Sequence, residues 1–133
     1  MLASLVSILS LMLSTLLMMV AFGLQSYVVP VRAVAEGWST QTISMIATGY
    51  TIGFTLSCIV TPKFVLLVGH VRVFVALITL LAIAILLCAL GVDWRAWMLF
   101  RAISGFAISG SYLIIESWLN EKVTNENRGS VFS

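Results

Sequence analysis

The stretch LFRAISGFAISGSYLIIESWLNE, residues 99–121, decides what kind of protein this chain is. It is long and apolar enough to cross a bilayer as a helix, since about 20 predominantly apolar residues span the hydrocarbon core. It nevertheless contains Arg101 near one end and Glu116 near the other. Charged residues inside a membrane are costly and usually functional, so both are candidate functional residues.

The whole chain has the composition of an integral membrane protein. Its 133 residues are 61% hydrophobic and 9% charged, and its mean hydropathy is +1.13. Soluble domains carry about 25% charged residues. The basic residues are scattered singly and the net charge is only +2, which argues against a nucleic-acid-binding protein with its clustered positive charge.

Residues that bind metals or perform catalysis are sparse. Cys58 and Cys88 lie in apolar runs without CxxC spacing, so we interpret them as packing residues. His70 is the single histidine, and we expect it to be a solvated loop residue because one histidine alone does not make a metal site. No paired nucleophile and base is evident. We therefore expect no metal, no cofactor and no enzymatic activity.

Four apolar runs predict an all-α membrane protein with four antiparallel transmembrane helices. Their approximate bounds are 5–29, 42–67, 71–90 and 97–119, with the start of a fifth helix from about 129. The first run is too long for a signal peptide, whose apolar region has about 7–15 residues. Short connections can only return the chain beside its neighbour, which makes the arrangement up and down.

The segments between and within these runs predict how the helices pack. Pro30 and Arg32 are expected in the first loop, followed by Ser39 or Thr40 as the cap of the next helix. Gly49 and Gly53 have the GxxxG spacing of closely packed membrane helices. The run 71–90 is almost uniformly apolar, which is typical of a helix that mostly faces lipid.

The distribution of basic residues predicts the orientation in the membrane. Four basic residues belong to one side and two to the other: Lys63, Arg72, Lys122 and Arg128 against Arg32 and Arg95. Basic residues favour the cytoplasmic side, so we expect a cytoplasmic N-terminus.

The two charges of residues 99–121 lie within about 60° of each other around a helix but about 22 Å apart along it, so they cannot pair. Gly105, Ser109 and Tyr112 fall on the same side. Two interpretations stay open. The charges face a polar pathway inside a bundle, or Arg101 and Glu116 extend towards opposite membrane surfaces.

These residues resemble the major facilitator superfamily of secondary transporters. RAISG, from Arg101 to Gly105, resembles the RxxxG signature of that superfamily's fourth helix. Glu121 followed by Arg128 and Gly129 resembles the acidic residue and RG pair before the fifth helix. ESWLNE with NENRG is most similar to a little-characterised bacterial branch, and FGLQSYVVPVR resembles the end of its first helix.

The resemblance departs from the family at one loop. PKFVLLVGHVR stands where the family has GxxxDRxGRR. Gly69 matches the second glycine, whereas Leu66 replaces the aspartate and His70 replaces an arginine. Arg72 or Lys63 is therefore the expected cytoplasmic gating partner of Glu121, together with Arg128.

The resemblance implies that residues 1–133 form the first third of a twelve-helix fold that works by alternating access. A secondary active transporter of a small solute is thus expected, as an incomplete chain in the inner (plasma) membrane. Arg101, Glu116, Tyr112 and Gln25 are the candidate pathway residues, with Glu116 the candidate carrier of a coupling proton. Further C-terminal helices, or another copy, would complete the pathway. The alternative is a noncatalytic four-helix membrane subunit that binds a partner protein.

Overall fold

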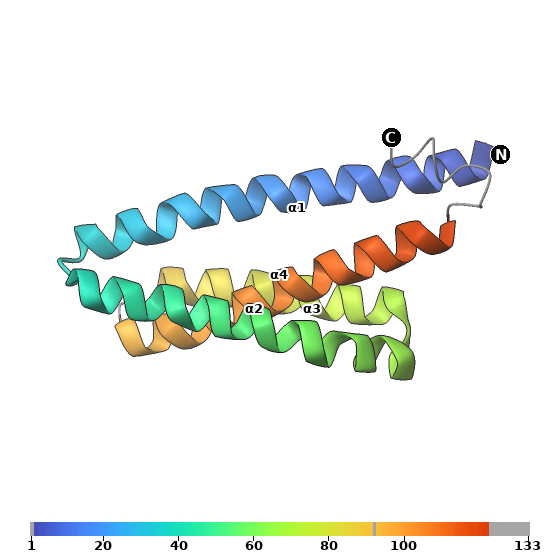
Figure 1. The fold of residues 1–133 in the computed structure, drawn as a ribbon. Coiled ribbons are helices and arrows are strands. Elements are labelled where there is room, and N and C mark those ends of the chain that lie inside the picture. The colour runs from blue at the N-terminus through green and yellow to red at the C-terminus, as the bar shows by residue number, and fades with distance from the viewer. Residues whose placement is uncertain (1, 92, 123–133) are drawn as a thin grey trace.

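The computed structural model describes residues 2–91 and 93–122, which form four α-helices (Figure 1). The helices are α1 (Leu2–Ala35), α2 (Thr40–Val68), α3 (His70–Leu90) and α4 (Trp94–Lys122). Apolar segments of this length form helices because a backbone in lipid must satisfy its own hydrogen bonds. All four are long and apolar enough to cross a membrane, and the described residues include no strand. The predicted fold class is confirmed; the predicted fifth helix and Arg128 lie outside the described residues.

Helix α1 is longer than predicted. We expected it to end near residue 29, with Pro30 and Arg32 in a loop, but the helix continues through both to Ala35. A proline removes one backbone donor, which membrane helices tolerate. The last turn is held by the ion pair of Arg32 with Glu36, in which Nε lies 3.1 Å from the carboxylate, and by Ala33, which is buried in an apolar cluster.

The connections between the helices are short and capped. Ser39 caps α2, because its hydroxyl accepts a hydrogen bond from the backbone N–H of Thr42 at 3.3 Å. Gly69 alone separates α2 from α3 and has a φ of +99°, a conformation that favours glycine. Asp93 precedes α4, and its carboxylate accepts from the N–H of Arg95 at 3.0 Å. The helices consequently alternate in direction, as predicted.

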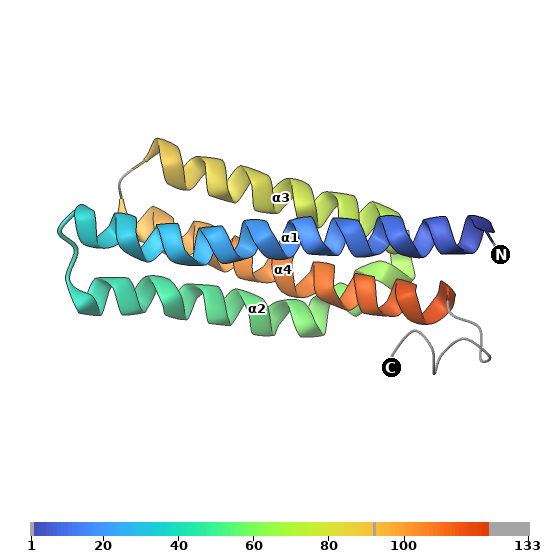
Figure 2. The same ribbon diagram turned by 90° about the horizontal axis from the view of Figure 1, so that it is seen from above.

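Helix α4 is the centre of the bundle. Its contacts are most extensive with α2, followed by α3, and few with α1. Figure 2 shows α1 lying over α4, with α3 and α2 on either side. The N-terminus, the α2–α3 connection and the C-terminal end of α4 lie at one end of the bundle (Figure 1).

Glycines bring α2 and α4 into backbone contact. A Cβ added at Gly49 would lie 2.7 Å from the carbonyl oxygen of Met98. Added Cβ atoms at Gly53 and Gly105 would overlap backbone atoms of the facing helix. The GxxxG pair therefore lies at the contact with α4, and close approach of small residues is a common way for membrane helices to pack.

Helices α1 and α3 each pack against the rest of the bundle through one narrow face. The buried residues of α3 lie three or four positions apart, from Val73 to Cys88, so they form one stripe while the opposite apolar face is exposed. Only four residues of α1 are buried: Leu11, Met18, Gln25 and Ala33. Gln25 is the one polar residue on that line.

Candidate functional site

Arg101 lies inside the bundle rather than at its edge. Its side chain is only 8% exposed, so it does not extend towards the membrane surface, which was one of the two interpretations left open. The guanidinium carbon lies 4.6 Å from the centroid of the Tyr50 ring. This is a cation–π contact, and such contacts are strongest where water is excluded.

A chain of hydrogen bonds joins α1 to α4 beside Arg101. The amide nitrogen of Gln25 donates to the hydroxyl of Ser104 at 3.3 Å, and Ser104 donates to the carbonyl of Phe100 at 2.9 Å. Gln25, Tyr50, Arg101 and Ser104 thus come from three helices to one place, and we call them the Arg101 cluster. Phe22 of α1 stacks on Tyr50 at 6.1 Å between ring centroids.

The Arg101 cluster contains no acidic side chain. The acids of the described residues all lie elsewhere: Glu36, Asp93, Glu116 and Glu121. Asp93 caps α4 and Glu36 pairs with Arg32. Among the described residues, the buried guanidinium therefore has an aromatic ring as its neighbour instead of a carboxylate.

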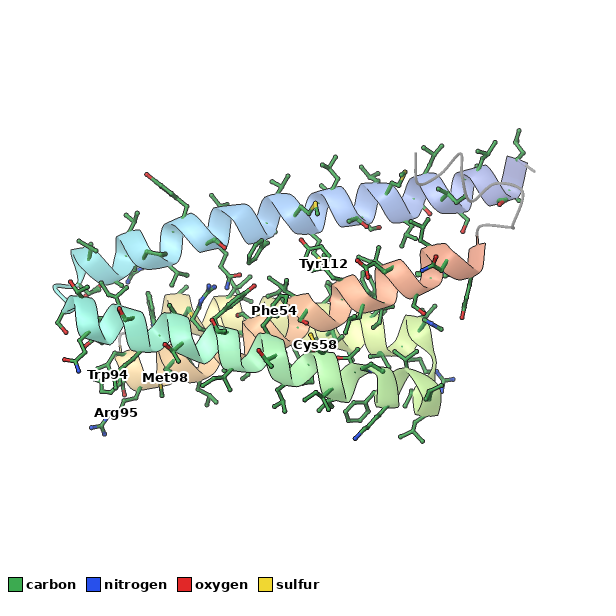
Figure 3. The ribbon with its side chains drawn as sticks, in the orientation of Figure 1. Phe54, Cys58, Trp94, Arg95, Met98 and Tyr112 are labelled. Carbon is green, nitrogen blue, oxygen red and sulfur yellow. The ribbon has the colours of Figure 1, made fainter. Side chains whose placement is uncertain are left out.

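Tyr112 and Glu116 do not belong to the Arg101 cluster. Tyr112 is half-buried and packs against apolar residues of two core clusters, between α4 and α1 (Figure 3). Glu116 is exposed and about 22 Å from Arg101 along the helix. The predicted stripe on α4 is therefore buried around Arg101 and open around Glu116, because the neighbours of α4 change along its length.

The other end of α4 carries a polar contact with α3. His70 is the first residue of α3 and half-buried, so our expectation of a solvated loop residue is wrong. Its Nε2 lies 3.0 Å from the hydroxyl of Ser117 and 3.6 Å from a carboxylate oxygen of Glu121. Ser117 and Glu121 share a face because they are four positions apart on a helix.

The expected gating partners of Glu121 are placed differently. Arg72 and Lys63 are exposed, and neither forms an ion pair within the described part of the chain. His70 therefore holds the position opposite Glu121 that we expected for Arg72 or Lys63. The sequence contained this signal, because His70 replaces a basic residue of the family's loop motif and directly follows the Gly69 turn.

Tyr50 and Ser104 are cluster residues that the sequence reasoning did not single out. Ser104 lies three positions after Arg101, on the same side of α4. Tyr50 follows Gly49, and its carbonyl oxygen lies against Gly105 where α2 and α4 are in backbone contact. The small residues at this contact were visible in the sequence, but their pairing across two helices was not.

A groove of about 330 Å³ between α1, α3 and the start of α4 touches the Arg101 cluster at Gln25, whereas Arg101, Tyr50 and Ser104 do not line it. Its lining is almost entirely apolar, and the exceptions are Gln25 and Arg32 of α1. Trp97 closes it on the side of α4, and the indole N–H of Trp97 donates to the carbonyl of Gly91 at 2.7 Å. A volume near the lower end of the ligand-pocket range suits a small molecule.

Fold and composition define a multi-pass membrane protein. Residues 11–133 match the family model described as Major Facilitator Superfamily. The chain therefore belongs to the major facilitator superfamily, whose members are transporters that carry small solutes across the lipid bilayer. No curated protein and no solved structure matches the chain.

Proposed function

We propose that this chain serves secondary active transport of a small solute by alternating access, with the Arg101 cluster on the solute pathway. The observation that carries the proposal is the buried guanidinium of Arg101, 8% exposed and in contact with an aromatic ring. A charged side chain within a membrane helix is costly to bury, which is why such residues mark solute and ion pathways.

The remaining pathway residues have supporting roles in this proposal. Gln25 offers hydrogen bonds from α1, and Tyr112 offers a hydroxyl between α1 and α4. Glu116 lies on the exposed part of α4, where it would carry a coupling proton once a further helix or a second copy covers that face. In this proposal the cytoplasmic gate lies at the end of the bundle away from the α1–α2 connection. Its residues would be Glu121 and His70, together with Arg72, Lys63 and Arg128.

Orientation and location form part of the same proposal. Lys63 and Arg72 flank the α2–α3 connection, which lies at the same end of the bundle as the N-terminus (Figure 1). Because basic residues favour the cytoplasmic side, we place the N-terminus in the cytoplasm and the protein in the inner (plasma) membrane.

A flux experiment tests the proposal. Cells that express the natural reading frame would be screened for uptake, efflux and resistance with labelled organic acids, amino acids and sugars and with toxic compounds. We compare wild type with Arg101→Ala and Glu116→Gln at matched expression. Arg95→Ala is the matched control, since Arg95 is an exposed arginine six positions earlier on α4 (Figure 3).

Two results separate transport from the alternative function. Loss of a flux in Arg101→Ala, with the flux kept in Arg95→Ala, supports the pathway role. An expressed protein that changes no flux, and whose Arg101→Ala variant loses a bound partner protein instead, would refute transport and favour the noncatalytic subunit.

A further inference from the structure

Two buried polar atoms of the Arg101 cluster have no hydrogen-bond partner among the described residues: Nη1 of Arg101 and Oε1 of Gln25. The two side chains are 8% and 6% exposed, respectively. Buried polar atoms are nearly always paired, so each unpaired atom requires an explanation. Nη1 of Arg101 is a donor and Oε1 of Gln25 is an acceptor, so the cluster can bind a ligand that both accepts and donates a hydrogen bond.

The hydrogen bonds fix which atom of the Gln25 amide is free. The hydroxyl of Ser104 uses its hydrogen to bond the carbonyl of Phe100 at 2.9 Å. It can therefore only accept from the amide of Gln25, which must present its NH₂ group at 3.3 Å. The carbonyl oxygen of Gln25 is consequently the atom left to accept a hydrogen from elsewhere.

The charge of the cluster is also unbalanced. Arg101 is permanently protonated, and no described carboxylate reaches it. The Tyr50 ring covers one side of the guanidinium, but it supplies no full negative charge. An anion is the group that would compensate this charge, and hydrogen bonds between charged groups are about twice as strong as neutral ones.

We propose that the Arg101 cluster binds a small organic carboxylate that also carries a hydroxyl or ammonium group. The carboxylate accepts from Nη1 of Arg101, and the hydroxyl or ammonium group donates to Oε1 of Gln25. This assignment names the substrate class and rests on the proposed transport function. A cation is repelled by Arg101, and a neutral solute leaves the guanidinium uncompensated.

The groove beside the cluster is consistent with a ligand of this kind. It reaches Gln25, measures about 330 Å³ and is otherwise lined by apolar side chains apart from Arg32. A ligand with a short apolar body would meet Gln25 and apolar surface in this groove. Its carboxylate would extend past Gln25 to Arg101, which does not line the groove.

Three probes of nearly equal size separate the required groups: lactate, propionate and lactamide. Propionate lacks the hydroxyl and lactamide lacks the charge. Binding to the purified full chain in detergent micelles is followed by tryptophan fluorescence and by the shift of the unfolding temperature. We expect lactate to bind, propionate to bind up to about tenfold more weakly, and lactamide not to bind.

Variants assign the binding to the cluster. Arg101→Gln is expected to abolish binding of lactate, whereas Arg95→Gln removes an exposed arginine of the same helix and is expected to keep it. Gln25→Leu is expected to make lactate and propionate equal, because it removes only the acceptor of the hydroxyl. Circular dichroism and size-exclusion profiles of each variant check that it is folded.

Several results would overturn the assignment. They are equal binding of lactamide and lactate, unchanged lactate binding in a folded Arg101→Gln variant, and no binding of lactate at all. The transport proposal fails separately. If Arg101→Ala loses flux of a neutral or cationic solute, the transport proposal is supported and the carboxylate assignment is refuted. If lactate binds specifically but no solute is transported, the carboxylate site is supported and the transport proposal is refuted.

Discussion

Replacing Gly53 by alanine is expected to have a large effect for a single added methyl group. A Cβ at Gly53 would overlap the backbone of Ala102, so α2 and α4 would have to separate. Overpacking costs about 1–3 kcal/mol, whereas alanine gains up to about 1 kcal/mol over glycine in helix propensity. With the full propensity gain subtracted, we expect Gly53→Ala to lower the free energy of unfolding by up to about 2 kcal/mol.

The assay is reversible unfolding of the purified chain in mixed micelles by a denaturing detergent, followed by tryptophan fluorescence. Gly23→Ala is the matched control, because a Cβ at Gly23 would have no atom within 4 Å. That variant gains helix propensity without a clash and should be as stable as wild type or slightly more stable. Equal stability of Gly53→Ala and Gly23→Ala would refute the close contact between α2 and α4.

The same substitution also tests how packing supports the site. Tyr50 lies one turn from Gly53 in the same backbone contact of α2 with α4, where its carbonyl oxygen lies against Gly105. Separation of the helices would move its ring away from Arg101, from which it is now 4.6 Å. We expect Gly53→Ala to weaken lactate binding as well, and unchanged binding in a destabilised variant would show that Tyr50 does not position Arg101.

Three other predictions concern the ends of the helices. His70→Ala removes the hydrogen bond between α3 and α4 and should lower the free energy of unfolding by about 1 kcal/mol; no change in the same assay would contradict this. Ser39→Ala should destabilise α2 by about 1 kcal/mol and Ser39→Asp should restore it, so a variant with aspartate as unstable as the one with alanine would argue against capping. In a background without native cysteines, a membrane-impermeant maleimide should label Glu36→Cys but not Leu67→Cys in intact cells, and the reverse pattern would refute a cytoplasmic N-terminus.

The number and direction of the helices could be predicted from sequence because apolar length and loop length determine them. Their ends could not. Helix α1 continues through Pro30, and α4 begins at Trp94 rather than near residue 97. These ends depend on contacts with other helices, such as the burial of Ala33, and on the carboxylate of Asp93.

The candidate site was only partly predictable for a related reason. Helical periodicity places Arg101 and Glu116 on similar faces of one helix, but burial depends on which neighbours cover that face. Arg101 is covered by Tyr50 of α2, whereas Glu116 is exposed. The sequence of α4 alone therefore could not distinguish a buried charge from one that extends to the membrane surface.

The contact line of α1 has a mechanical consequence. Its buried residues recur at intervals of seven or eight positions, so α1 meets the other helices along one line and has few contacts with α4. Among the described residues, the bond from Gln25 to Ser104 is the only side-chain hydrogen bond that ties α1 to another helix. Gln25 therefore attaches α1 to the bundle through its NH₂ group. A solute that donates to the free Oε1 of Gln25 leaves this bond in place, so α1 would stay attached to α4 while the solute is bound.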